Sequence, residues 1–224
     1  MGLTKDFSEK PLEFLADYIV VVQDDSKGNP ADVTVDFYLS PANDNIPGNN
    51  YVFLKKCGAQ KPTEIIPAYW LPWDKGKANA LTLGNKAKFM FTSELTNCRF
   101  SVLTGDMEKP KVAHVEGTEG SKHRDKLEVE AGFPERQKEE KLMRRLSITG
   151  IKNLTKDRSD TGPKHKYFGQ SGETSSAFVF GYREQTTWKF YAQIVKGVMA
   201  GAGMNALKSA TEKVVPLDKA YEIA

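Results

Sequence analysis

The chain has 224 residues, which is long enough to bury one sizeable hydrophobic core. Hydrophobic residues make up 39% of the chain, and its 12 Phe, 8 Tyr and 3 Trp argue against a disordered protein. The formal net charge is only +3, whereas a nucleic-acid-binding protein normally carries a clustered basic stripe, so the charge does not favour that class.

Seven short stretches in the first half of the chain have the composition of β-strands. They are residues 18–22, 33–39, 51–54, 65–71, 88–92, 98–103 and 111–115. These stretches are apolar or alternate between apolar and polar residues, and turn-forming residues separate several of them. Pro67 interrupts the fourth stretch, so we expect that strand to lie at a sheet edge or to carry a bulge.

The chain changes character at residues 116–145, which are rich in Glu, Lys and Arg. Gly132 and Pro134 interrupt this segment, which predicts a short surface helix on each side, the better one at residues 136–146. We expect the charged residues of both helices to face solvent. Beyond them the sequence predicts a strand at 146–151, a polar loop at 156–176, a hairpin formed by 177–182 and 187–194, and a small-residue helix at 198–210.

The predicted elements indicate the α+β class. We expect one domain, residues 1–224, with a β-sandwich-like core of mixed or antiparallel strands flanked by helices. No apolar run is long enough to cross a membrane, and the first residues lack the hydrophobic region of a signal peptide. Two cysteines, Cys57 and Cys98, do not make a disulfide framework, so we expect the protein to work in a reducing cytosol.

The usual cofactor motifs are missing from the sequence. It contains no phosphate-binding loop, no dinucleotide-binding glycine motif and no paired-cysteine zinc motif. The three histidines, His114, His123 and His165, do not fall at metal-ligand spacings. We therefore expect neither a cofactor nor a metal.

The residue types that indicate chemistry are Cys98 and His114, which belong to consecutive predicted strands. If those strands are neighbours, an imidazole beside the thiol lowers the thiol pKa and produces a thiolate nucleophile. A thiolate can attack a carboxamide carbon while the imidazolium protonates the departing ammonia. From spacing alone, a structural Cys98 packed in a strand is the favoured alternative, because cysteine is a common buried residue.

Two further groups complete the hypothesis. Thr92 lies six residues before Cys98, and its oxygen could accept a hydrogen bond from the second imidazole nitrogen and fix the tautomer. The backbone N–H groups of Asn97 and Cys98 are the expected donors to the oxyanion of the tetrahedral intermediate.

At these residues the sequence resembles the glutamine-deamidase toxins of the Burkholderia lethal factor family and, more distantly, the catalytic domain of cytotoxic necrotizing factor. The resemblance covers roughly residues 30–118. The pieces that carry it occur in the same order: residues 33–39 with Ser-Pro-Ala-Asn at 40–43, Tyr-Trp-Leu-Pro-Trp at 69–73 with Lys75-Gly76, Met90-Phe91-Thr92, Leu95-Thr96-Asn97-Cys98, Gly105-Asp106, and His114.

The resemblance implies a helix-flanked β-sandwich with Cys98 as nucleophile, His114 as general base and acid, and Thr92 as the group that orients His114. The family has glycine where this chain has Asn97, the residue best suited among non-glycines to a positive φ. The loop between Cys98 and His114 is also longer here, around residues 104–110, and a longer rim loop changes which target fits.

The resemblance further implies a bacterial toxin that is delivered to the host cytosol and converts a glutamine of a host protein to glutamate. The target it suggests first is the RNA helicase of eukaryotic translation initiation, which would block translation, and the second is a Rho-type GTPase. No direct nucleic-acid or membrane partner is expected.

Three alternatives stay open at this point. The same Cys–His pair could serve a transglutaminase or a cysteine protease, and a non-catalytic binding module could share the fold. Faster alkylation of Cys98 than of Cys57 is the result expected of an active enzyme.

Overall fold

The computed structural model describes residues 2–23, 30–41, 51–59, 61–103, 105–117, 121–135, 151–155, 164–166, 175–196 and 221–222. The helices in these ranges are α1 (Leu3–Glu9), α2 (Pro11–Asp17) and α3 (Ser121–Glu130). No helix of the described ranges is long and apolar enough to cross a membrane.

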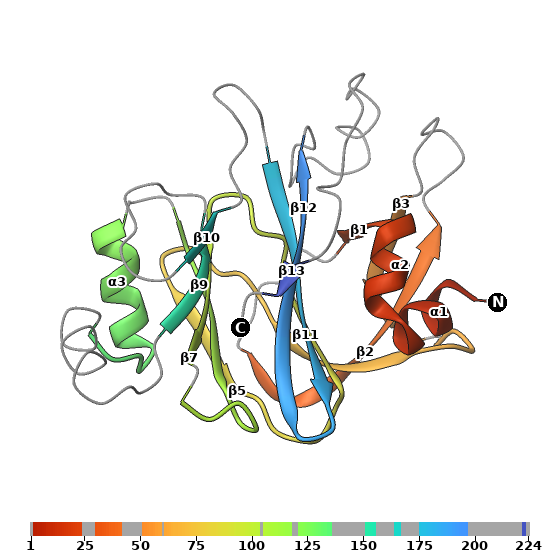
Figure 1. Cartoon of the computed structure of the whole chain (residues 1–224), viewed down its shortest axis with the longest axis horizontal. Coiled ribbons are helices and arrows are strands. Elements are labelled where there is room, and N and C mark those ends of the chain that lie inside the picture. The colour runs from red at the N-terminus through yellow and green to blue at the C-terminus, as the bar shows by residue number, and fades with distance from the viewer. Residues whose placement is uncertain are drawn as a thin grey trace.

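Two β-sheets form the centre of the molecule (Figure 1). The larger sheet, sheet A, has the strand order β1 (Ile19–Val22), β3 (Tyr51–Lys56), β2 (Ala31–Pro41), β4 (Ile66–Leu71), β6 (Phe89–Thr92), β11 (Ser175–Glu184), β12 (Thr187–Lys196) and β13 (Tyr221–Glu222). Sheet B has the order β10 (Lys164–Lys166), β9 (Ile151–Thr155), β7 (Arg99–Leu103), β8 (Lys111–Val115) and β5 (Ala78–Thr82). Parallel pairing occurs at β1–β3, β4–β6 and β9–β10, and the other described pairs are antiparallel.

Alternating side chains of both sheets build three buried layers, because successive residues of a strand point to opposite faces. Between the sheets lies a core that includes Met90 from sheet A and Phe100 and Val112 from sheet B. The residues on either side of Met90, Phe89 and Phe91, point to the other face of sheet A and pack against α1 and α2. The sheets are therefore stacked, and each has a helical layer on its outer face.

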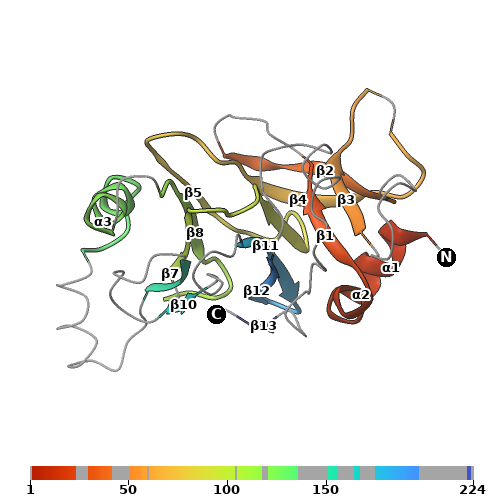
Figure 2. The same ribbon diagram turned by 90° about the horizontal axis from the view of Figure 1, so that it is seen from above.

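The helices lie at opposite ends of this stack (Figures 1 and 2). On sheet A, α1 and α2 bury Phe7 and Phe14, whose rings meet edge to face at 5.5 Å. On sheet B, α3 and the turn that follows it bury Leu127 and Phe133 against Ala113 and Val115 of β8. Burial of a large aromatic or aliphatic side chain contributes about 1.5–3 kcal/mol, so the helical layers are held mainly by these contacts.

The predicted fold class is confirmed: the protein is α+β with a sandwich of mixed sheets flanked by helices. All seven strands predicted in the first half are present, with ends within two residues of the prediction, and the 177–194 hairpin is present as β11 and β12. The sequence prediction missed α1, α2, β5, β10 and β13, and β10 lies within the segment that was predicted to be a loop. The predicted helices at 136–146 and 198–210 lie outside the described residues, as do most of the 146–151 strand and most of the 156–176 loop.

Two predictions of position are wrong. The strand containing Pro67 is not at an edge, because β4 lies between β2 and β6. Proline is tolerated because pairing with β6 begins only at Ala68, and the register shift lies on β2, between Ala31 and Val35. The helix at 121–130 is also more than a solvated face, since Arg124 and Glu128 are 2% and 1% exposed.

Candidate active site

Three predicted site residues converge between the two sheets. Thr92 ends β6 and points to the same face as Met90, which belongs to the core between the sheets. In β8, His114 has the orientation of Val112, which also belongs to that core. Cys98 directly precedes β7 and packs in the same core. All three side chains therefore belong to the layer between the sheets, where Thr92 of sheet A contacts His114 of sheet B.

A hydrogen bond between Thr92 and His114 crosses from sheet A to sheet B. The Thr92 Oγ1 lies 2.7 Å from Nδ1 of His114 and 2.7 Å from the carbonyl oxygen of Leu71. A hydroxyl has one proton, and Thr92 donates it to Leu71, so the imidazole must donate through Nδ1–H to Oγ1. The neutral ring then carries its free lone pair on Nε2, which is the tautomer that a general base needs.

The lone pair on Nε2 is available. Among the described residues, this buried nitrogen has no hydrogen-bond partner. In the register of β7 and β8, His114 lies opposite Phe100, and Cys98, two residues before Phe100 and directly before β7, packs in the same core as Phe100. Such diagonal positions are separated by about 7–8 Å or less between backbone positions, a gap that a thiol and an imidazole can close.

The sulfur of Cys98 is surrounded by donors. It is hydrogen-bonded by the backbone of Asn97, by the backbone of Gly117 and by the Trp73 side chain, whose only donor is the indole N–H. Donors directed at sulfur favour the thiolate. They are outweighed here, because burial and the nearby Glu116 carboxylate raise the pKa of the Cys98 thiol to about 12.

The Cys98 and His114 side chains are therefore both uncharged at rest. Burial lowers the pKa of His114 to about 3, so the imidazole is uncharged at neutral pH, as is the thiol. Burial disfavours the predicted thiolate–imidazolium pair, because Cys98 and His114 are only 6% and 1% exposed and an ion pair there would lose its hydration.

The geometry around Asn97 also differs from expectation. Its φ is not positive, since Gln185 is the one non-glycine residue with positive φ in the described ranges, and the Asn97 side chain is exposed. The requirement for glycine falls instead on Gly117: a Cβ there would lie 1.8 Å from the carbonyl oxygen of Asn97. The backbone after β8 therefore packs directly against the backbone before β7.

The segment around Trp73 is fixed over the site by two hydrogen bonds. The backbone N–H of Trp73 donates to Oγ of Ser93 at 2.9 Å, and Nδ2 of the buried Asn79 donates to the carbonyl of Pro72 at 2.8 Å. Sequence reasoning assigned Trp73 no catalytic or positioning role, although Trp73 belongs to the Leu-Pro-Trp piece of the resemblance. No local sequence pattern marks Gly117 as important, because glycine is required there only by the close approach of the backbone at residues 97 and 98.

The other candidate residues lie elsewhere. Cys57 follows β3 and donates its backbone N–H to the carbonyl of Asp36, in sheet A. His123 belongs to α3, on the outer face of sheet B, and the side chain of His165 is outside the described residues. Within the described ranges, no group of three or more His, Cys, Asp or Glu side chains is arranged to hold a metal ion.

Comparison with known proteins finds a solved structure with a similar fold. The chain is similar to the C-terminal domain of CNFy from Yersinia pseudotuberculosis, with a TM-score of 0.50 and 9% sequence identity over 98% of this chain and 97% of that chain. No protein-family model matches the chain, and no curated protein matches it. At this identity the likeness shows a shared fold, which agrees with the more distant of the two sequence resemblances. The resemblance to the Burkholderia lethal factor stays a prediction.

Proposed function

We propose that the protein is a cysteine-dependent glutamine deamidase acting on a host protein. The observation that carries this proposal is the Thr92–His114 hydrogen bond, which leaves Nε2 without a hydrogen-bond partner among the described residues, in the layer between the sheets that also holds Cys98. The fold shared with a CNFy domain supports the same class of activity, and the lethal factor resemblance supports it through the Thr, Cys and His positions.

The chemistry follows from the neutral resting pair. As the sulfur of Cys98 attacks the carboxamide carbon of the glutamine, its proton passes to Nε2 of His114. The tetrahedral oxyanion forms beside the backbone of residues 97 and 98, the predicted donors. His114 then returns the proton to the departing nitrogen, which leaves as ammonia, and a thioester remains.

Hydrolysis completes the cycle. His114 takes a proton from water, the hydroxide oxygen forms a bond to the thioester carbon, and the sulfur leaves and recovers its proton. The products are glutamate and ammonia, and the enzyme is unchanged. Thr92 keeps Nδ1 protonated in both halves, so that Nε2 alone exchanges protons with the reacting groups.

The target is part of the proposal. Following the sequence resemblance, the first candidate is the RNA helicase of eukaryotic translation initiation, and a Rho-type GTPase is the second. Either would be modified in the host cytosol. The exposed Asn97 and the loop at 104–110 border the site in sequence, so they are the places where target choice would be determined.

A second candidate, a non-catalytic binding module, has one observation in its favour. The thiol of Cys98 is buried and its pKa is about 12, whereas a reactive cysteine usually has a depressed pKa and access to solvent. Under the deamidase proposal, a bound glutamine replaces solvent at the sulfur and the proton leaves only during attack. The two candidates therefore differ in turnover and not in resting thiol reactivity.

The experiment is incubation of the wild-type protein and Cys98→Ser with eukaryotic cell lysate, followed by a proteome-wide mass-spectrometric search for Gln-to-Glu changes. Cys57→Ser is the matched control, since it removes the other thiol. We expect conversion by wild type and Cys57→Ser and none by Cys98→Ser. Conversion by Cys98→Ser would refute the proposal. Addition of an amine mass would identify a transglutaminase, backbone cleavage a protease, and an unmodified proteome a binding module.

A further inference from the structure

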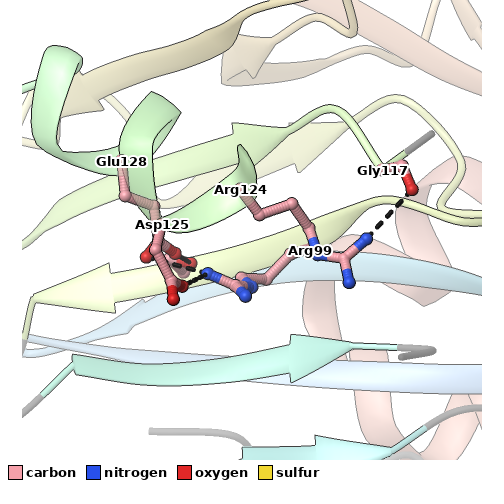
Figure 3. A network of polar contacts seen from close by, with 6 residues as sticks. Arg99, Gly117, Arg124, Asp125 and Glu128 are labelled. Carbon is pink, nitrogen blue, oxygen red and sulfur yellow. Dashed lines mark hydrogen bonds and ion pairs between the residues drawn. The ribbon is translucent and has the colours of Figure 1, made fainter. Parts of the chain in front are cut away.

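Helix α3 is connected to the candidate site through the backbone of Gly117. The Nη1 of Arg124 donates to the carbonyl oxygen of Gly117 at 2.9 Å, and Figure 3 shows the guanidinium directed at that carbonyl. Arg124 is only 2% exposed, and guanidinium groups stay charged when buried. This hydrogen bond from a buried cation holds the carbonyl of Gly117 in position, because hydrogen bonds from charged donors are stronger than neutral ones.

Gly117 in turn contacts the nucleophile. Its backbone N–H is a hydrogen-bond donor to the sulfur of Cys98. A Cβ at this position would also lie 3.0 Å from the backbone nitrogen of Cys98, in addition to its overlap with Asn97. The N–H therefore reaches the sulfur only because no side chain separates the two backbones.

The helix is itself anchored next to Cys98. Arg99, the residue that follows the nucleophile, is fully buried, and its Nη1 lies 2.7 Å from Oδ1 of Asp125 and 2.9 Å from Oε2 of Glu128. Figure 3 shows this pairing on the side of sheet B that carries α3. A short hydrogen bond from Ser101 to Glu128 adds a third attachment. The helix thus holds both strands that flank the site, β7 through Arg99 and the end of β8 through Gly117.

We propose that the N–H of Gly117 is a main-chain donor at the reaction centre and that Arg124 is the positioning residue that keeps it there. This role rests on the proposed deamidase chemistry. The donor stabilises the sulfur whenever it carries negative charge, which happens as its proton passes to His114 and again when the thioester breaks. Loss of the donor therefore slows the chemical steps and leaves substrate binding unchanged.

The test uses the whole protein and two kinds of readout. Arg124→Met removes the guanidinium, and Lys126→Met is the matched control, because Lys126 is an exposed cation of the same helix paired with Glu130. For Arg124→Met we expect kcat on the protein substrate to fall by about tenfold or more with KM within about twofold, and no change in the control. Arg124→Lys, which retains one charged donor, should recover part of the loss.

The second readout does not depend on activity. In nitrogen-15-labelled protein, the Gly117 amide should exchange slowly with solvent, exchange at least about tenfold faster in Arg124→Met, and shift its proton resonance when Cys98 is changed to Ala. If the wild type has no deamidase activity, the proposed function fails and these amide measurements still decide the contact. An unchanged kcat in Arg124→Met, or a Gly117 amide that does not respond to Cys98→Ala, overturns the inference. Should Arg124→Met not fold, Arg124→Lys and the Cys98→Ala shift carry the test.

Discussion

The hydrogen bond between Thr92 and His114 can be removed with almost no change of shape by Thr92→Val. The Thr92 side chain is fully buried, so no water is positioned to replace the hydroxyl. Valine keeps the volume and loses two contacts of 2.7 Å, one to Leu71 and one to His114.

The magnitude follows from counting which partners are left unpaired. The carbonyl of Leu71 keeps a second donor, the backbone N–H of Ser93 at 3.3 Å. The Nδ1–H of His114 keeps none among the described residues, so one buried donor is orphaned, which costs about 1–3 kcal/mol. In a chain of 224 residues each kcal/mol lowers Tm by about 2–4 °C. Without the Thr92 acceptor, the tautomer with the proton on Nδ1 is also no longer favoured over the tautomer with the proton on Nε2.

The assay combines urea unfolding with nitrogen-15 spectroscopy of the His114 ring. We expect Thr92→Val to lose stability by the stated amount, to lose the exclusive Nδ1–H tautomer, and to lose activity by less than His114→Ala does, because Thr92 orients and transfers no proton. Thr92→Ser is the control, since it keeps the hydroxyl and loses one methyl, worth about 1 kcal/mol. A valine variant with wild-type stability and an unchanged tautomer would refute the reasoning.

Four further predictions concern the surroundings of the site. The depressed pKa of His114 means that the unfolded chain takes up a proton below pH 6.5 that the folded chain takes up only near pH 3, so stability should fall as pH drops through this window, by up to about 1.4 kcal/mol per pH unit, and His114→Gln should flatten that slope in urea titrations. In the resting protein iodoacetamide should label Cys57 before Cys98, the reverse of the order expected from the sequence, because Cys57 is half-buried and Cys98 is buried with a pKa of about 12; peptide mapping that finds Cys98 labelled first would contradict a buried, neutral thiol. Trp73→Phe keeps an aromatic ring and removes one donor to the sulfur, so kcat should fall by about two- to tenfold, and an unchanged kcat would show that the indole N–H has no part in turnover. Glu128→Ala breaks a buried ion pair and should cost about 3 kcal/mol or more in chemical unfolding, and a cost below about 1 kcal/mol would mean that α3 is not anchored through this residue.

The strands could be predicted from the sequence because their signal is local. The segment 89–92 is a short, mostly apolar run. Both faces of β6 are buried, so the composition of this run alone indicated a strand. In contrast, β5 reads Ala-Asn-Ala-Leu-Thr, which has weak β propensity, and it is a strand because it pairs with β8. The helices α1 and α2 have seven residues each and are stabilised by burying Phe7 and Phe14 against sheet A, which no local pattern reports.

The site residues also fall into those that could be predicted from local sequence and chain order and those that could not. His114 lies in β8 and Cys98 directly precedes β7, the antiparallel neighbour of β8, so the placement of the two residues in adjacent segments could be predicted from chain order. The position of Thr92 followed from the family resemblance, since its contact with His114 depends on how two sheets stack. The neutral state of the thiol depends on its burial between the sheets and on the charge of Glu116, a residue from a separate segment, and neither can be read from the residues next to Cys98. The requirement for glycine at position 117 could not be predicted, because it comes from a backbone contact with a residue twenty positions earlier in the chain.

One consequence follows from the placement of the orienting residue in sheet A and of the other two in sheet B. Either sheet by itself holds an incomplete set: a folded sheet B would present a thiol and an imidazole whose tautomer nothing fixes. The proposed catalytic set is therefore complete only after the two sheets have packed against each other. Any partly folded form of this chain, however much secondary structure it has, should be catalytically silent.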